Sequence, residues 1–497
     1  MLFRKIFNHF SLIKFSIRTF SHTSRLYTKE FIDRHIQSLI NDNEFASMSS
    51  ALLHIRSAGH RVYIIQPSMK FKARGRQSTT AQLQLSESIA LIETLNKWRV
   101  VGHGIYTLKT SGSQRYLYGK GNVEKITNEV HECQATAVFV SIDRLSLVQI
   151  DGLTEKFRVP VYDRYSIVLQ IFKNHAQSGA AKLQVALAEI PLLRYRKNDS
   201  ELFKDREQNL RAEVAKLEQH RKLLKKRRLS IDIPTVAVVG YTNAGKTSLI
   251  KALTKDASLQ PKNQLFATLD VTTYAGVLPN ALNVLYVDTV GFIADIPTTL
   301  IEAFRATLND AIDAHLIIHV CDISHPDYVV QYKTVIQTLR DLDIPSSKLE
   351  SIITVFNKYD LLNQQTSDDQ EIDEQDNNEE EKEKIFSQKS MPDINIENNN
   401  RLYISCKTNQ GLNQLTDILQ KKLMIASDRI TCVYRVLQGG QYYQVLVNDD
   451  ICTIENMIVD EHDPQFIHLK CLFSKAAYAK FQAHYSGASK YQISNDS

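Results

Sequence analysis

The chain has 497 residues, 43% of them hydrophobic, and is long enough to bury several cores in about three domains. Its net charge of +5 conceals an acidic segment, because residues 368–383 hold ten Asp or Glu and one Lys, so the remainder is basic and suited to a polyanionic partner. No apolar run reaches the roughly 18–20 residues of a membrane span, and the six cysteines lack CxxC spacing, which argues against membrane insertion, a zinc site and a disulfide framework.

The first 29 residues have the composition of a targeting segment. They contain six Lys or Arg and no acid, and their apolar residues recur at helical spacing. This pattern predicts a mitochondrial presequence in residues 1–29, and hence a protein of the mitochondrial matrix. A basic tail that binds RNA or membrane is the alternative. Residues 30–60 are weakly patterned and are interpreted as a linker.

Residues 61–179 alternate short β-branched runs with helical stretches. The run RVYIIQP opens at Arg61, and helical patterns occupy 87–98, 123–132 and 145–157. Strands that alternate with helices indicate a small α/β domain with a largely parallel sheet.

Two helical stretches follow, at 180–195 and 201–228, with a polar break between them. Matching apolar stripes predict that residues 180–230 form an antiparallel helical hairpin. Between Lys204 and Arg228 there are ten Lys or Arg and four acids, which fits either a solvated helix face or a nucleic-acid contact. The densest part of this basic run consists of Lys222, Lys225, Lys226, Arg227 and Arg228.

Strand and helix patterns alternate again over residues 231–428, which predicts a second α/β domain. The acidic, Asn-rich tract 363–400 within it is interpreted as a disordered surface insertion, with no function of its own as the favoured interpretation. Residues 429–497 are predicted to form a small α+β domain. Its expected elements are strands at 430–437, 442–448, 452–459 and 466–473 and a helix at 474–484.

A phosphate-binding loop is predicted where the strand-like run VAVVG meets a helical one. The spacing Gly-x-x-x-x-Gly-Lys-Thr lets backbone amides face phosphates, while the lysine reaches the terminal phosphate and the threonine hydroxyl reaches Mg²⁺. The residues expected to bind the nucleotide here are Gly240, Asn243, Ala244, Gly245, Lys246, Thr247 and Ser248.

Three later strand ends complete a nucleotide site. In DTVG, a carboxylate would hold Mg²⁺ and a glycine amide would sense the γ-phosphate. In NKYD, an Asp can accept both edge hydrogens of guanine, which selects GTP over ATP, and SCK can close over the base. The residues concerned are Asp288, Gly291, Asn357, Lys358, Asp360, Ser405, Cys406 and Lys407.

With these motifs in order, the sequence resembles the HflX family of translation-factor GTPases, and specifically a mitochondrial member. The stretches GYTNAGKTSL, LFATLDVTTY, DTVGFIADIP and NKYD carry the resemblance, and YLYGKGNVEKI and AAKLQVALAEI extend it upstream. It implies a Ras-like P-loop GTPase domain, mostly parallel in its sheet. Before it would come the small α/β domain with its hairpin, and after it the α+β domain.

The resemblance also implies roles for individual residues. Thr268 would coordinate Mg²⁺ and the γ-phosphate, so that Thr247, Thr268 and Asp288 hold the metal and Lys246, Thr268 and Gly291 serve catalysis. Phe292 stands where many Ras-like GTPases keep a water-orienting glutamine, which implies slow intrinsic hydrolysis. Asn243 has two open roles, as a ligand of K⁺ or as a stabiliser of the turn.

The function that this resemblance implies is GTP-dependent dissociation of mitochondrial ribosomes, by a monomer bound to the large subunit and its rRNA. An assembly or quality-control factor for the large subunit is the alternative. A non-ribosomal RNA-binding module with negligible turnover is a third, of a different class. The hairpin tip, YRKNDSELF, departs from the glycine-rich loop usual in the family.

Overall fold

The computed structural model describes most of the chain between residues 59 and 496. The presequence and all but two residues of the linker predicted above lie outside the described residues. By contacts, the chain divides into two compact units. No helix in the described part of the chain has the length and apolar character needed to cross a bilayer. The described ranges are 59–68, 79–108, 115–197, 200–231, 233–261, 264–269, 272–293, 312–342, 344–365, 401–448, 451–485 and 488–496.

The first unit contains a four-stranded sheet in which every pairing is parallel, in the order β2-β1-β3-β4. Helices α4 and α5 pack on one face through an apolar cluster that includes Ile126 and Leu153. Helix α3 contacts β1, β2 and α6. The elements are β1 (Arg61–Ser68), α3 (Ala81–Thr94), β2 (Arg99–Thr107), α4 (Lys120–Glu132), β3 (Ala137–Val140), α5 (Leu147–Phe157), β4 (Val161–Tyr162) and α6 (Arg164–His175).

His60 belongs to this domain, although the sequence pattern placed it in the linker. Its side chain is buried, its ring lies 4.7 Å from that of Trp98, and its Nε2 lies 3.3 Å from the hydroxyl of Tyr162. A single buried histidine gives no periodic signal, so only the tertiary contacts reveal it.

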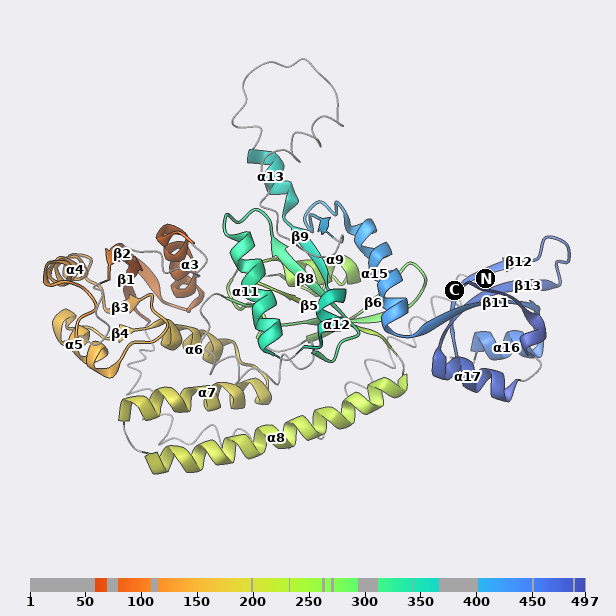
Figure 1. Ribbon diagram of the computed structural model, residues 1–497, viewed down its shortest axis with the longest axis horizontal. Helices are drawn as coiled ribbons and strands as arrows, with labels where there is room; N and C mark the ends of the chain where they lie inside the picture. Colours follow the sequence, from red (N-terminus) through yellow and green to blue (C-terminus); the bar gives the residue numbers. More distant parts are fainter. Residues whose placement is uncertain are drawn as a thin grey trace, which may run out of the picture. The chain divides into compact units, whose positions relative to one another are not determined.

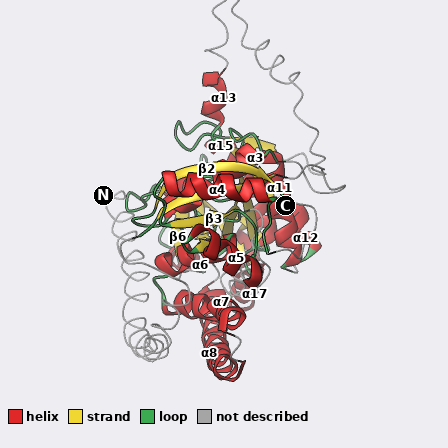
Figure 2. Cartoon of the chain, turned by 90° about the vertical axis from the view of Figure 1, so that its left-hand side faces the viewer, coloured by secondary structure: helices red, strands yellow, loops and turns green. Residues whose placement is uncertain are grey.

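Two long helices follow, α7 (Gly179–Lys197) and α8 (Ser200–Ile231). The hydroxyl of Tyr165 in α6 donates to the carbonyl of Ala188 in α7 at 2.7 Å. On the other side, Arg194 of α7 pairs with Glu207 of α8 at 2.6 Å. The end of α7 thus lies beside the beginning of α8, as in an antiparallel hairpin. Figure 2 shows the two helices next to each other.

The second unit contains a six-stranded sheet in the order β10-β9-β8-β5-β7-β6, parallel except for β6. Its middle strands are almost entirely apolar because helices cover both faces (Figure 1). The predicted α/β class and mostly parallel sheet are confirmed. The elements are β5 (Thr235–Gly240), α9 (Lys246–Thr254), β6 (Thr272–Val277), β7 (Asn283–Asp288), β8 (Leu316–Asp322), α11 (Tyr328–Asp341), α12 (Ser346–Ser351), β9 (Ile353–Asn357), α13 (Tyr359–Gln365), β10 (Arg401–Tyr403) and α15 (Leu412–Ala426).

Parallel pairing brings the carboxyl ends of β5, β7, β8 and β9 to the same edge of this sheet. The motifs predicted to bind nucleotide follow these strands, so they meet there although more than a hundred residues separate them. Helix α13 extends to Gln365, three residues into the predicted acidic insertion, and the rest of that insertion lies outside the described residues.

The same unit ends in a βαββαβ domain whose antiparallel sheet has the order β12-β13-β11-β14. Helices α16 and α17 bury one face of this sheet (Figure 1). The elements are β11 (Arg429–Leu437), α16 (Gln441–Asn448), β12 (Thr453–Val459), β13 (Phe466–Ser474), α17 (Lys475–His484), a 3-10 turn (Ala488–Tyr491) and β14 (Gln492–Asp496).

The strand predicted at 442–448 is wrong, because these residues form helix α16. The Tyr and Val content of YYQVLVN favours a strand by composition. The tertiary structure uses a different spacing: Tyr442, Val445 and Leu446 recur at helical intervals and pack against the sheet.

Candidate functional site

The predicted phosphate-binding loop connects β5 to α9. Gly245 has a φ of 98°, which only glycine adopts without strain, and a Cβ added to it would lie 2.3 Å from Nδ2 of Asn357. Glycine is therefore required by both the backbone and the neighbouring side chain. Asn243 is exposed in the same turn with a φ of 60°, and Ser248 is half-buried in the first turn of α9.

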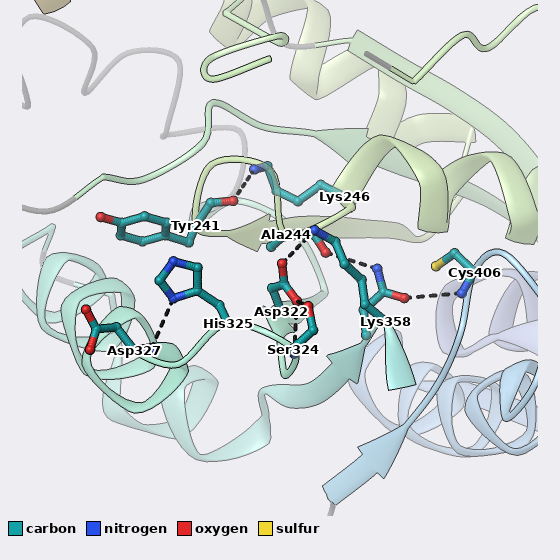
Figure 3. Close-up of polar contacts among 10 residues, drawn as sticks. Tyr241, Ala244, Lys246, Asp322, Ser324, His325, Asp327, Lys358 and Cys406 are labelled. Carbon is teal, nitrogen blue, oxygen red and sulfur yellow. Dashed lines mark hydrogen bonds and ion pairs between the residues drawn. The ribbon is translucent and has the colours of Figure 1, made fainter. Parts of the chain in front are cut away.

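Lys246 is buried at the first residue of α9, and its side chain points back over the loop. Its ammonium donates to the carbonyl of Tyr241 at 3.0 Å (Figure 3). It also donates to the carbonyl of Gly240 at 3.2 Å. Burial lowers the pKa of Lys246 to about 8, an effect that nearby Asp288 partly offsets. A buried ammonium whose hydrogen-bond partners are neutral carbonyls would be stabilised by the negative charge of a phosphate.

Asp288 gathers the side chains predicted to hold Mg²⁺. Its Oδ2 accepts from the hydroxyl of Thr247 at 2.7 Å and from that of Thr268 at 3.1 Å, and the two hydroxyls lie 3.4 Å apart. Burial raises the pKa of Asp288, while Lys246 and the two hydroxyls oppose the rise. Its Oδ1 is buried without a hydrogen-bond partner among the described residues. Two hydroxyl oxygens beside a carboxylate that has one unpaired oxygen fit a hard cation that prefers oxygen ligands.

Gly291 lies directly against the phosphate-binding loop. A Cβ added to it would lie 2.8 Å from Cγ2 of Thr242 and 3.1 Å from Nζ of Lys246. The next residue, Phe292, donates its N–H to the carbonyl of Gly240 at 3.1 Å and accepts from the N–H of Thr242 at 2.7 Å. These two bonds join the DTVG segment to the loop, and the sequence motifs carry no signal for them.

Asn357 ties the far end of the loop to the predicted base-binding segments. Its Nδ2 donates to the carbonyl of Ala244 at 3.0 Å, and its Oδ1 accepts from the N–H of Cys406 at 3.2 Å. Since it is buried and both ends of its amide are bonded, Asn357 joins three separate parts of the chain. Burial raises the pKa of the Cys406 thiol to about 12, so the thiol is neutral near pH 7.

The remaining NKYD side chains are held by further contacts. Lys358 pairs with Asp322 at the end of β8, with 2.5 Å between Nζ and Oδ2 (Figure 3). Asp360 accepts from the hydroxyl of Ser405 at 2.7 Å, and that oxygen accepts in turn from the N–H of Thr408 at 3.1 Å. The hydroxyl thus fixes the orientation of the Asp360 carboxylate that is expected to read guanine.

The structure therefore brings every predicted site residue to one edge of the sheet, with Lys407 exposed in the turn that contains Cys406. Sequence reasoning missed Asp322, although its position at the end of a buried strand, like Asp288, was an available signal. Figure 3 shows it between Ser324, whose hydroxyl donates to it at 2.5 Å, and Lys358.

Comparisons with known proteins extend along most of the chain. A family profile described as 50S ribosome-binding GTPase matches residues 235–358, and one described as GTP-binding GTPase N-terminal matches residues 82–173. The chain is 33% identical over 453 residues to GTP-binding protein 6 of Homo sapiens, covering 86% of this chain and 81% of the human one. Identity to the Xenopus laevis protein of that name is 40% over 354 residues, 66% of each chain. Identity to a GTPase HflX of Lacrimispora saccharolytica is 32%, over 65% of this chain and 75% of the bacterial one.

Proposed function

Because the chain belongs to the HflX family of GTPases, we propose that it binds the large subunit of mitochondrial ribosomes in its GTP state and separates the subunits. The chain is a GTPase, with GTP as substrate. The observation that carries the proposal is that the relationship extends beyond the nucleotide-binding domain, through the N-terminal domain, to 86% of the chain. A shared GTPase domain alone would support nucleotide hydrolysis and no particular partner.

The nucleotide would lie along the edge where the strand ends meet. Backbone amides from Gly240 to Ser248 would face the phosphates, and the Lys246 ammonium would exchange its carbonyl partners for phosphate oxygens. Thr247, Thr268 and Asp288 would hold Mg²⁺, which supplies neutralisation of charge on the phosphate oxygens when bound. K⁺ at Asn243 is an extension of this proposal, since that side chain is exposed beside the loop.

Contacts in the site indicate how a change from GTP to GDP would alter the surface of the protein. Thr268 contacts Asp288 directly, and Gly291 lies against Lys246, so both switch segments touch the side chains that would bind metal and γ-phosphate. Loss of the γ-phosphate removes a ligand shared by these contacts and releases both segments. A ribosome-binding surface built on the two segments would then depend on GTP.

Helix α8 would supply phosphate contacts to rRNA through its basic run, which positions a protein without reading base sequence. Reversing the charges of Lys225 and Lys226 is expected to weaken ribosome binding and to lower its salt dependence. Reversal at Lys333 and Lys421, which are exposed on other helices, is the matched control. Equal effects of both pairs would mean that the basic run is a solvated face.

The experiment that tests the function is sedimentation of mitochondrial ribosomes through a sucrose gradient with the protein lacking residues 1–29. With a non-hydrolysable GTP analogue, the ribosomes are expected to split and the protein to travel with the large subunit, whereas GDP leaves them intact. If the protein sediments with the large subunit without splitting ribosomes, an assembly role replaces this proposal. If it stays at the top of the gradient, the ribosome is not its partner.

Localisation to the mitochondrial matrix rests on the composition of residues 1–29. The full chain is expected to enter isolated mitochondria and to lose an N-terminal segment, and the chain lacking residues 1–29 is expected to stay outside. Import of the shortened chain would show that these residues serve another purpose, such as binding RNA.

A further inference from the structure

The outer strand of the C-terminal sheet has an unusual surface. Strand β12 is at the edge of the sheet and, among the described residues, pairs only with β13 (Figure 1). Its last four residues are all exposed, and three of them are consecutive apolar side chains. Met457 is 39% exposed, Ile458 57% and Val459 55%.

Neighbouring residues of a strand point to opposite faces, so this exposure means that neither face of the edge is covered. Sheet edges in monomeric proteins are normally protected by lysine, proline or a bulge. The register of β12 shifts between Ile454 and Asn456, but no Lys or Pro occurs from Thr453 to Val459, and the exposed residues lie beyond the shift. Within the described part of the chain, the edge at 456–459 is therefore left open to another strand.

The sequence that contains this edge has more acids than bases. Residues 449–463 contain six acids and neither Lys nor Arg. Of the four described acids, Glu455 pairs with Lys470 at 3.3 Å and Asp460 pairs with Arg435. Glu461 is exposed, and Asp463 accepts from the N–H of Gln465 at 3.1 Å. An open edge in such surroundings repels phosphate and attracts a basic chain.

The helix-free face of the same sheet does not offer a better site for RNA. It carries Arg435, His468 and Lys470, but Asp460 binds the first two and Glu455 binds the third. The guanidinium of Arg435 also covers the ring of Phe466, 4.1 Å from its centroid, so this aromatic face is not free to stack on a base.

We propose that the β12 edge accepts an extended, basic segment of another protein as an additional strand. The partner chain would form main-chain hydrogen bonds with β12 and bring Lys or Arg to the acidic flanks. Its alternate apolar side chains would lie on one face, against Ile458 or against Met457 and Val459. The source of the strand rests on the proposed function: ribosomal proteins are the basic chains that this protein would meet on the large subunit. The docking itself does not depend on that function.

A synthetic peptide that alternates valine and lysine tests the docking without ribosomes. The full chain is expected to bind it, with slowed amide hydrogen exchange in residues 453–459. Ile458→Lys should weaken binding roughly tenfold or more, because it removes an apolar contact and adds a repelling charge. The matched control is Ile493→Lys: Ile493 is 52% exposed on β14, the opposite edge strand, and this change should leave binding within about twofold. GTP hydrolysis by the free protein should be unaffected by either change.

Evidence for any other ligand at this edge would overturn the proposal. Tighter binding of a valine–glutamate peptide or of single-stranded RNA, with the same loss in Ile458→Lys, would assign the edge to a different ligand. Self-association of the chain that Ile458→Lys abolishes would assign it to a second copy. Equal binding of the valine–lysine peptide by Ile458→Lys and Ile493→Lys would show that β12 is not the site. Since none of these measurements contains a ribosome, failure here and failure of the ribosome experiment are distinguishable.

If both experiments succeed, a photo-crosslinking amino acid at position 458 of the GTP-loaded protein should crosslink a Lys- or Arg-rich segment of a large-subunit protein. The same group at position 493 should not. A crosslink to rRNA at position 458 would contradict the proposed partner.

Discussion

The Asn357 side chain donates a hydrogen bond from its amide nitrogen to the carbonyl of Ala244 and accepts one at its amide oxygen from the N–H of Cys406. These two bonds join the phosphate-binding loop to the loop that would close over the base. One buried side chain therefore couples the two ends of the nucleotide site, and a change there should affect both.

Replacement of Asn357 by Ala should lower the free energy of unfolding by about 2 kcal/mol. One buried and one part-buried hydrogen bond are lost, and the Ala244 carbonyl and the Cys406 N–H lose this partner. GTP affinity should fall about tenfold or more. Chemical denaturation and calorimetric titration measure the two effects. Asn413→Ala, at an exposed position of α15, is the control and should change neither. An unchanged GTP affinity in Asn357→Ala would show that the two loops are positioned independently.

Asp360→Asn tests the identity of the base. An amide in place of the carboxylate can no longer accept both guanine hydrogens, so preference should shift from guanosine towards xanthosine triphosphate. Competition binding with the two nucleotides measures the shift. Ser405→Ala removes only the hydroxyl that orients the carboxylate. It should therefore weaken the binding of both nucleotides and leave GTP the more tightly bound. Full retention of GTP binding in Asp360→Asn would remove Asp360 from the base site.

The buried ammonium of Lys246 should make stability depend on pH. Burial lowers its pKa from the ordinary 10.5 to about 8 in the folded protein, so between these two pH values the unfolded chain binds more protons. Stability should therefore rise with pH across that window, by at most about 1.4 kcal/mol per unit from this one group.

Denaturant unfolding at pH 7.5 and 9.5 measures this dependence, and Lys246→Met, which keeps the apolar stem, isolates the contribution. Because other groups also titrate, the quantity to compare is the difference between the two proteins. This difference should grow with pH in favour of the natural chain. A difference that is constant with pH would mean that Lys246 stays fully protonated in its buried position.

Phe292 should resist conversion into a catalytic glutamine. Its side chain is only 4% exposed, and its backbone is bonded to the phosphate-binding loop. Phe292→Gln would replace a buried ring with a buried amide and should lower the free energy of unfolding by about 2–4 kcal/mol. Single-turnover GTP hydrolysis should stay within a few-fold of the natural rate. Phe292→Leu should be milder in stability and equal in rate. A rise of about a hundredfold in Phe292→Gln would show that this position reaches the attacking water.

The sequence alone identifies the chemistry of the site because its motifs are local. The spacing of Gly240, Gly245, Lys246 and Thr247 is readable without contacts, and so is the appearance of DTVG, NKYD and SCK after strand-like runs. The alternation of strands with helices is likewise periodic, so the α/β class follows from it. Each of these signals lies within a few consecutive residues.

Only the tertiary structure decides what depends on distant partners. Whether 442–448 is a strand or a helix depends on the sheet against which Val445 and Leu446 pack. Burial of Phe292, the use of both ends of the Asn357 amide and the exposure of β12 likewise depend on residues far along the chain. Exposure and hydrogen bonding are properties of a residue's surroundings, and those surroundings exist only once the chain has folded.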